Sequence, residues 1–578
     1  MKKYILLASI ALSCCLTSCE NFLNTENLTK KDTSNFPQNK KDLESALIGI
    51  YSNLSEGVGC KAHSNFFVSC VASDDAFGGG GNNDKFFHAF DFLMSAGENM
   101  FENFWEVRYK GIFRSNSLIE TMNNTQVSEI ERKNILGETY FLRAFFYYDL
   151  ASLFGTVPLV LQTEPLNLPK ATPEILYGQI ASDLKNAIEM LPSVRYSDTQ
   201  SGHVTKWAAE AMMARVFLFY TGFYNKTEIT LPDGLKITKA NVIEWLNDCI
   251  ANSGHDLLND YRQIWPYTNS ITLASYKNDN VMKQNQLIWA EDFGKSSPET
   301  LFSIKFSNQS TNQGNTLALG YSNQMCLFMG LRGGSQNKEA IYPFGQGWGA
   351  APINPQVYID WTASEPTDKR IEASIINLPI ELPGYKKGAD NNVQETDFYQ
   401  KKIMPIRAKV IEADGKTKMY DSFSIPMFGN KGDYQTCNIQ DLILIRYADV
   451  LLMHSELTET TDGINRVRLR ANLSPLTAYS LKALQDERRW EFVGEGIRWN
   501  DIRRWKIAEK ELEKQTGQNI YNFGVASKSN SYGGGYAKRY AETKGFFPIP
   551  ESQIKLSENI LKQNEGWGQE ANYGGWTK

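Results

Sequence analysis

Hydrophobic residues recur at helical spacing over much of the first 220 residues. After Lys41, apolar side chains return every three or four positions as far as Leu54, which predicts a helix. The segment over 131–154 is apolar or aromatic almost all round, so we expect it to lie between other helices. The same spacing predicts further helices over 102–122, 173–191 and 204–220.

Small residues follow one face of the last of these helices. Ala208, Ala211 and Ala214 are three positions apart, and small side chains let two helices approach closely. Successive helix pairs of this kind favour a tetratricopeptide-like solenoid. The repeat of about 34 residues that is typical of that architecture is not clean in this chain, so self-similarity alone supports it only in part.

From about residue 227 to residue 430 the pattern becomes irregular. The stretches ITLPDGLKIT (229–238) and VIEADGKTKMY (410–420) place Asp-Gly between β-prone arms and predict hairpins. Long loops rich in Asn, Gly and aromatic residues occupy 259–285 and 307–356. Loops of that length inside a compact chain are usually functional.

Helical patterns return near the C-terminus, over 441–457, 463–473 and 481–496. The chain is therefore expected to be mainly α, with a tetratricopeptide-like helical scaffold at both ends and an irregular, loop-rich insert that contains short β-hairpins. We treat it as a single globule over 41–578, with parts at 41–226, 227–430 and 431–578.

The first residues indicate export rather than a part of the fold. Lys2 and Lys3 precede an apolar stretch that is too short to span a bilayer as a helix. The Leu-Thr-Ser-Cys sequence that ends at Cys19 resembles a bacterial lipobox, and the two cysteines just upstream fit that pattern less well. Ordinary secretion with an incidental cysteine is the alternative. We expect a lipoprotein signal peptide over 1–18, acylation of Cys19 and a tether over 19–40, which would anchor the chain to a membrane outside the cytoplasm.

Charge and residue usage exclude several classes of function. The formal net charge of −5 does not favour nucleic acid as a partner. None of the five histidines has a His or Cys at metal-ligand spacing, and no catalytic or phosphate-binding motif occurs. We therefore expect no metal, no cofactor and no enzymatic activity. Five cysteines beyond Cys19, too widely spaced for a disulfide framework, leave any pairing open: Cys60, Cys70, Cys249, Cys326 and Cys437.

The stretch ERRWEFVGEGIRWNDIRRW over 487–505 concentrates charge of both signs. Charges three or four positions apart are neighbours on a helix, and the mixture of signs argues against a nucleic-acid strip. A glycosidase needs one carboxyl group kept protonated, whereas arginines beside each carboxylate should lower its pKa. We interpret the stretch as a structural charge network made by Glu487, Arg488, Glu491, Glu495, Arg498 and Asp501.

Several segments form a recognisable set in chain order. They are ENFLN and DLESALIGIYSNL after the lipobox, ILGETYFLRAFFYYDLASLFGTVPLV, SPETLFSIKFS, GWGAAPINPQVYIDW, LIRYADVLLMHSE, the charged stretch above, and GFFPIPESQIKLSENILKQNEGW. By these segments the chain resembles the SusD/RagB family of outer-membrane lipoproteins over essentially its whole length. Departures are mild, such as Thr-Asp-Lys-Arg at 367–370 in place of the commoner Asp-Pro-Arg.

The resemblance implies both a fold and a function. It implies a SusD-like lipoprotein on the outer membrane, facing the cell exterior, that binds oligo- or polysaccharide and delivers it to a SusC-like TonB-dependent transporter for import. Catalysis would belong to separate enzymes. Two alternatives stay open: a surface glycoside hydrolase, and a scaffold lipoprotein that binds no sugar.

A sugar-binding surface combines aromatic rings, which stack on the C–H faces of sugars, with polar side chains that bond their hydroxyls. The loops over 73–90, 259–268 and 321–361 contain both kinds of residue. The alternatives are that the two aspartates of the first loop cap a helix and that the tryptophan of the third lies in the core. From composition we expect sugar contacts from Asp74, Asp75, Phe77, Asn82, Asn83, Trp265, Tyr267, Tyr321, Arg332 and Trp348.

Overall fold

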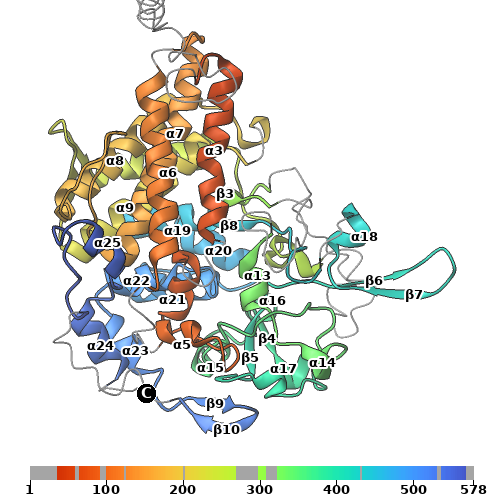
Figure 1. Cartoon of the computed structure of the whole chain (residues 1–578). Coiled ribbons are helices and arrows are strands. Elements are labelled where there is room, and N and C mark those ends of the chain that lie inside the picture. The colour runs from red at the N-terminus through yellow and green to blue at the C-terminus, as the bar shows by residue number, and fades with distance from the viewer. Residues whose placement is uncertain are drawn as a thin grey trace, which may run out of the picture.

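A column of long helices dominates the computed structural model, and an irregular part with short hairpins lies beside its lower half (Figure 1). The structure describes residues 36–58, 64–91, 99–122, 125–199, 202–268, 297–306, 322–429, 433–529 and 535–567. Within these residues, the helices are all too short or too polar to cross a membrane. The predicted mainly α fold is confirmed.

The helices of the N-terminal part pack in chain order. The α7 helix contacts α6 on one side and α8 on another, and α8 in turn contacts α9. Every residue of α7 from Phe141 to Phe154 is buried, as its apolar circumference predicts. The helix begins at a capping box made by Ser128 and Glu131, and it ends at Gly155, whose φ is 77°. The bounds are α3 (Lys40–Val58), α4 (Asn65–Val71), α5 (Lys85–Asp91), α6 (Glu102–Thr121), α7 (Glu129–Phe154), α8 (Pro173–Met190), α9 (Lys206–Tyr224) and α10 (Lys239–Asn252).

One predicted helix is in fact a strand followed by a helix. The segment over 441–457 forms β8 (Leu442–Arg446) and then α19 (Tyr447–Thr458), so the single-helix prediction was wrong in its first third. Leu-Ile-Leu-Ile has no helical polar face, and it pairs antiparallel with β3 (Thr300–Ile304), about 140 positions away in the chain. That distant partner decides the conformation.

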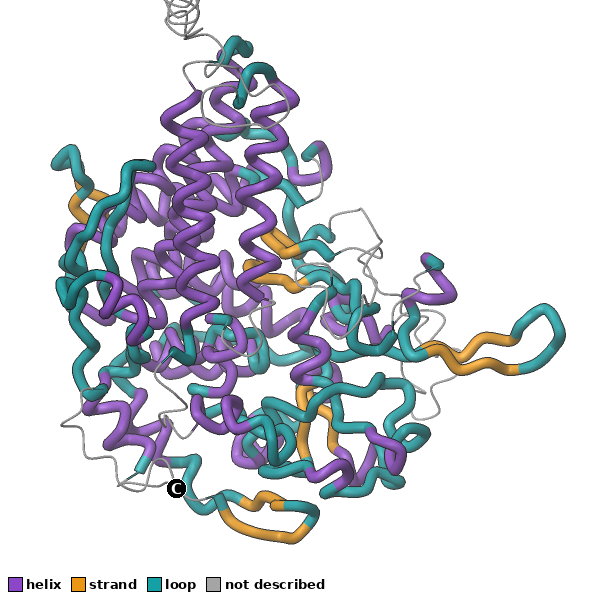
Figure 2. The backbone as a smooth tube through the Cα atoms, viewed as in Figure 1, coloured by secondary structure: helices purple, strands orange, loops and turns teal. Residues whose placement is uncertain are grey.

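The irregular part is built from short pieces, and strands are few throughout (Figure 2). The two predicted Asp-Gly hairpins form, and β6–β7 projects from the body of the molecule (Figure 1). Each further sheet is also a single antiparallel pair. The pairs are β1 (Glu228–Thr230) with β2 (Lys236–Thr238), β4 (Ile375–Asn377) with β5 (Phe398–Gln400), β6 (Ala408–Ile411) with β7 (Thr417–Tyr420), and β9 (Asn519–Asn522) with β10 (Val525–Lys528). The helices of the irregular part are α13 (Gln324–Met329), α14 (Gly334–Asn337), α15 (Pro355–Ser364), α16 (Lys369–Ser374), α17 (Leu378–Glu381) and α18 (Ser424–Phe428).

The C-terminal part completes the scaffold by packing on the N-terminal helices. The α19 helix contacts α9 and α10, and α22 contacts α9. The α21 helix ends at Phe492, earlier than predicted, because Gly494 and Gly496 follow with φ of 76° and 70°. The remaining bounds are α20 (Asp462–Arg470), α21 (Leu481–Phe492), α22 (Arg498–Arg504), α23 (Ala508–Glu513), α24 (Tyr536–Thr543) and α25 (Glu551–Leu556). A large apolar core fills the scaffold, and a smaller one lies in the irregular part around Tyr399 and Trp265.

Candidate functional site

A glycine-rich loop between α4 and α5 is held by backbone hydrogen bonds to a distant segment. The amide of Gly80 donates to the carbonyl oxygen of Gly349 at 2.9 Å, and the amide of Ala351 donates to that of Gly78 at 3.0 Å. Gly79 has a φ of +67°, and a Cβ there would lie 2.4 Å from the Gly349 oxygen. The loop therefore needs glycine both for its conformation and for its close approach to residues 349–351.

Arg332 braces this loop against two others. Its Nη1 donates to Asp84 Oδ2 at 3.1 Å and to the carbonyl oxygen of Trp348 at 2.9 Å. Its Nε donates to the carbonyl oxygen of Asp390 at 3.0 Å, and its Nη2 lies 3.4 Å from Asp390 Oδ2. Asp84 in turn accepts from the amide of Gly81 at 2.7 Å. One guanidinium thus fixes three loops relative to one another.

Four of the ten residues predicted to bind sugar come together at this brace. Asn82 and Asn83 are exposed, and Arg332 and Trp348 are half-buried. The Trp348 ring packs on Phe328 with centroids 5.2 Å apart, and the residue as a whole is partly accessible. Their role as sugar contacts stays a prediction.

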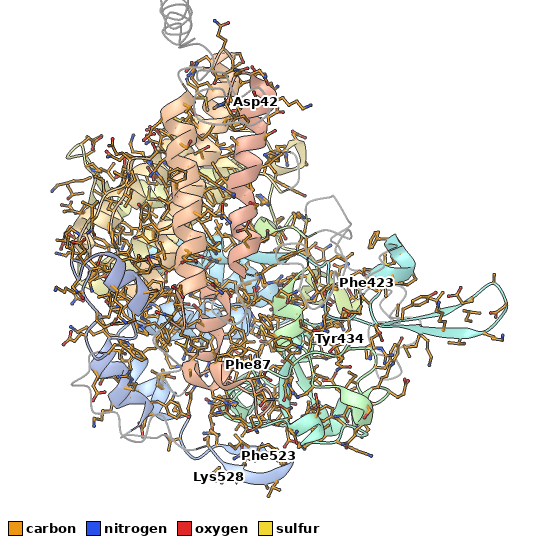
Figure 3. The ribbon with its side chains drawn as sticks, in the orientation of Figure 1. Asp42, Phe87, Phe423, Tyr434, Phe523 and Lys528 are labelled. Carbon is orange, nitrogen blue, oxygen red and sulfur yellow. The ribbon has the colours of Figure 1, made fainter. Side chains whose placement is uncertain are left out.

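Sequence reasoning missed three residues of the same surface: Asp84, Asp390 and Tyr434. Burial raises the pKa of Tyr434, the neighbouring carboxylates of Asp433 and Asp390 raise it further, and Arg332 opposes them. Figure 3 places Tyr434 where the scaffold meets the irregular part. Asp84 directly follows Asn83 in the loop already singled out, whereas Asp390 and Tyr434 come from distant segments that no motif marks.

Asp74 and Asp75 do not reach the surface. Arg498 Nε lies 2.8 Å from Asp74 Oδ1. Arg489 contacts both aspartates: its Nη2 lies 2.8 Å from Asp74 Oδ2, and its Nε lies 3.1 Å from Asp75 Oδ1. Burial alone raises the pKa of Asp74, but the two arginines hold it well below its ordinary value. Phe77 is also fully buried. These three residues are structural, and the prediction that they contact sugar does not fit this structure.

Trp265 and Tyr267 are core residues as well. They are 4% and 3% exposed and belong to the smaller core, where Lys402 Nζ lies 5.2 Å from the ring centre of Trp265 and Lys401 Nζ lies 5.5 Å from that of Tyr267. The prediction rested on the mixture of aromatic and polar residues in the 259–268 loop, and composition does not reveal that the core encloses these two side chains. Tyr321 lies outside the described residues.

The charge-rich stretch lies inside the protein. Glu491 is 2.9 Å from both Arg370 Nη1 and Arg446 Nη1, and Glu495 is 2.6 Å from Lys402 Nζ. All six residues named from the sequence take part in buried ion pairs: Glu487, Arg488, Glu491, Glu495, Arg498 and Asp501.

The pKa values of these carboxyl groups do not all shift in the predicted direction. Burial raises the pKa of Glu491, but Arg470, Arg446 and Arg370 together hold it well below its ordinary value. For Glu487, burial and the Asp368 carboxylate together raise the pKa more than Arg370 and Arg468 lower it, which corrects the expectation that arginine depresses the pKa of every carboxyl group here. Glu487 is only 1% exposed, so its carboxyl group is out of reach of a substrate.

The cysteines that the structure describes are buried free thiols. They are Cys70, Cys249, Cys326 and Cys437, while Cys19 and Cys60 lie outside the described residues. Burial raises the pKa of Cys437 to about 12, so its thiol is unreactive at neutral pH. Within the described ranges, His, Cys, Asp and Glu side chains form no group of three or more that could hold a metal ion.

Two family models match this chain. The model described as starch-binding and associating with the outer membrane matches residues 21–218, and the model of the SusD family matches residues 298–567. This chain belongs to the SusD family. The family predicted from the sequence is thereby confirmed.

Named relatives share sequence with this SusD-family chain over all or part of its length. The SusD-like protein P2 of Formosa agariphila is 24% identical over 595 residues, which cover 98% of this chain and 100% of that protein. A SusD-like protein of Bacteroides ovatus is 26% identical over 187 residues, which cover 31% of this chain and 32% of that protein.

Solved structures share the fold of this SusD-family protein. A laminarin-binding SusD-like protein matches with a TM-score of 0.65 and 23% identity over 92% of this chain and 100% of its own. Surface glycan-binding protein A from Bacteroides fluxus matches with a TM-score of 0.67 and 21% identity, over 92% of this chain and 100% of its own. Surface glycan-binding protein A from Bacteroides thetaiotaomicron, in complex with laminarihexaose, matches with a TM-score of 0.64 and 19% identity. The match covers 91% of this chain and 100% of that one.

Proposed function

We propose that this SusD-family protein binds oligo- or polysaccharide at the cell exterior and passes it to a SusC-like TonB-dependent transporter. The observation that carries the binding step is the surface where Trp348, Asn82 and Asn83 lie on loops braced by Arg332. An indole face can stack on a sugar ring, and amides can both donate to and accept from hydroxyl groups. A rigid backbone beneath them lowers the entropy cost of binding.

Two solved relatives support this ligand class. One is named for binding laminarin, and another was solved with laminarihexaose. Both share the fold over about nine tenths of this chain. We extend to this protein the class of ligand, a glycan, and not the particular sugar.

The membrane part of the proposal rests on the N-terminus. Acylation of Cys19 would anchor the chain, and the tether over 19–40 would join the lipid to α3. The family model that matches the N-terminal part is described as associating with the outer membrane, which supports this location. We place the transporter contact on the tetratricopeptide-like scaffold, and the protein would act as a hinged lid over the transporter.

We propose no catalytic role for this protein. The carboxyl groups that looked most like catalytic candidates, Glu487, Glu491 and Glu495, are 7% exposed or less and are paired with cations. Hydrolysis of a glycosidic bond needs two carboxyl groups that converge on the substrate. Cleavage of the glycan is therefore assigned to other proteins.

Affinity electrophoresis and calorimetry over a panel of polysaccharides test glycan binding. Trp348→Ala should weaken binding at least about tenfold because stacking is lost. Trp245→Ala removes another half-buried tryptophan, in α10, and should leave the affinity within about twofold, since it lies outside the proposed surface.

New reducing ends in the same mixtures would contradict the non-enzymatic assignment. A chain that binds no glycan but still copurifies with a transporter would instead support the sugar-free scaffold.

A further inference from the structure

The charges at the proposed glycan surface restrict the class of glycan that it can take. Arg332 is the guanidinium at the centre of this surface, and among the described residues it forms ion pairs with Asp84 and Asp390. Two carboxylates face one cation, so the three groups together carry a net negative charge. The Asp390 carboxylate is 56% exposed, whereas the Arg332 side chain is 16% exposed. An approaching ligand therefore meets the negative group first.

Three of the five donors of Arg332 are used in hydrogen bonds within the protein. An arginine has five N–H donors. Nε donates to the Asp390 carbonyl oxygen, and Nη1 uses both of its donors, on Asp84 and on the Trp348 carbonyl oxygen. Nη2 pairs with the Asp390 carboxylate at 3.4 Å. Only Nη2 can still offer donors, and the two parallel N–H···O bonds of bidentate recognition need donors from two nitrogens, so Arg332 cannot bind a carboxylate or sulfate group in that way.

Backbone also packs against the third nitrogen of the guanidinium. A Cβ on Gly81 would lie 2.3 Å from Arg332 Nη2, so the Gly81 backbone packs directly on that nitrogen. Arg332 is thus a positioning residue that holds the loops of Gly81, Trp348 and Asp390. Its charge is matched by Asp84 and Asp390 within the protein, while a direct bond from Arg332 to a sugar hydroxyl stays a prediction.

From these contacts we infer that this surface selects uncharged glycans and rejects those that carry uronate or sulfate groups. The inference rests on the proposed function, because it concerns the same surface. Stacking on Trp348 and amide contacts from Asn82 and Asn83 need no charge on the sugar. An anionic group would be repelled by Asp390, and Arg332 has no second nitrogen with a free donor for bidentate binding.

A chemically matched ligand pair tests this inference. A neutral polysaccharide that binds in the panel, beginning with laminarin, is oxidised at C6 to uronate, and a second sample of the oxidised polymer is methyl-esterified to restore neutrality. We expect the oxidised polymer to bind at least about tenfold more weakly than the neutral one, and the methyl ester to recover most of that loss. The affinity for the neutral polymer should not depend on salt concentration.

A variant connects the effect to the named carboxylate. Asp390 has a φ of 55°, a conformation that asparagine also adopts readily, so Asp390→Asn removes the charge without straining the backbone. The variant should raise the ratio of the affinity for the oxidised polymer to the affinity for the neutral polymer about threefold or more. Asp233→Asn, an equal charge change in the exposed β1–β2 turn, should leave that ratio unchanged.

The outcomes separate the two proposals. Binding of acidic polysaccharides as tightly as neutral ones, with an affinity that falls steeply with salt, would overturn the selection for uncharged glycans while leaving glycan binding intact. An unchanged ratio in Asp390→Asn would also overturn it. Failure to bind any neutral or acidic glycan would overturn the proposed function itself.

Discussion

Arg498 and Asp74, 424 positions apart in the sequence, form a buried ion pair in which Nε lies 2.8 Å from Oδ1. Arg489 reaches the other oxygen of the same carboxylate at 2.8 Å. The pair joins the charge-rich stretch around α21 and α22 to the segment that leads into the glycine-rich loop. The C-terminal family segment therefore holds in place a loop from the opposite end of the chain.

Breaking this ion pair should destabilise the fold. Asp74→Asn leaves Arg498 and Arg489 with one carboxylate fewer inside the protein, and removing one member of a buried pair typically costs about 3–5 kcal/mol. Urea denaturation would measure the free energy of unfolding. Asp486→Asn, which breaks the exposed pair with Lys482, should cost less than about 1 kcal/mol. Equal losses in the two variants would show that the buried pair has no special structural role.

Glu210 should make stability depend on pH. It is fully buried in α9, with Lys206 Nζ 3.5 Å away. Burial raises the pKa of Glu210 to about 9, against an ordinary value of 4.5, although Lys206 lowers it in part. Between these values the folded state keeps the proton and the unfolded state loses it. The contribution of Glu210 to stability is therefore fully present below pH 4.5 and is lost as the pH rises toward about 9, by at most about 1.4 kcal/mol per pH unit.

The variant Glu210→Gln isolates this component, because glutamine cannot ionise. Urea denaturation of both proteins between about pH 5 and about pH 8 should show the variant gaining in free energy of unfolding relative to wild type as the pH rises. Other groups titrate in both proteins and cancel in the difference. A difference that does not change with pH would mean that Glu210 is ionised in the folded state.

The glycine-rich loop should not tolerate a side chain at position 79. Gly79→Ala adds a Cβ 2.4 Å from the carbonyl oxygen of Gly349 in a left-handed conformation, so we expect a loss of at least about 2 kcal/mol in the free energy of unfolding. Gly415→Ala is the matched control, since its φ is +76° and nothing lies within 4 Å of the added carbon. It should cost about 1 kcal/mol. Similar costs would mean that the loop yields without strain.

Cys19 should determine where the protein is found in the cell. Cys19→Ser removes the thiol that we propose to be acylated, so the chain should move from the membrane fraction to the soluble fraction. Cell fractionation with immunoblotting measures this, and metabolic labelling with a fatty acid shows the modification directly. Cys60→Ser should change neither result. Membrane retention of an unlabelled Cys19→Ser protein would point to another means of attachment.

Local pattern was sufficient for the long helices and for two hairpins. The repeat of apolar residues predicted α7 and α8 to within about two residues at each end, because an amphipathic or wholly apolar helix shows its period within a short window. Asp-Gly predicted β1–β2 and β6–β7 because the tight turn is encoded by the two residues that form it. The mixed charges of 487–505 likewise indicated pairing rather than a basic strip.

Tertiary contacts decided which of the candidate residues reach the surface. Asp74 and Asp75 look like exposed loop aspartates until Arg489 and Arg498 are brought beside them, and Trp265 is enclosed by a core that forms only when Lys402 and Arg446 pack on it. Leu442–Arg446 is a strand because β3 supplies its partner. By itself the sequence determined the helical scaffold, the family and the kinds of residue available to a ligand. Burial and pairing depend on groups hundreds of positions away, so only the folded chain decided that Trp348, Asn82 and Asn83 lie on the surface that Arg332 braces.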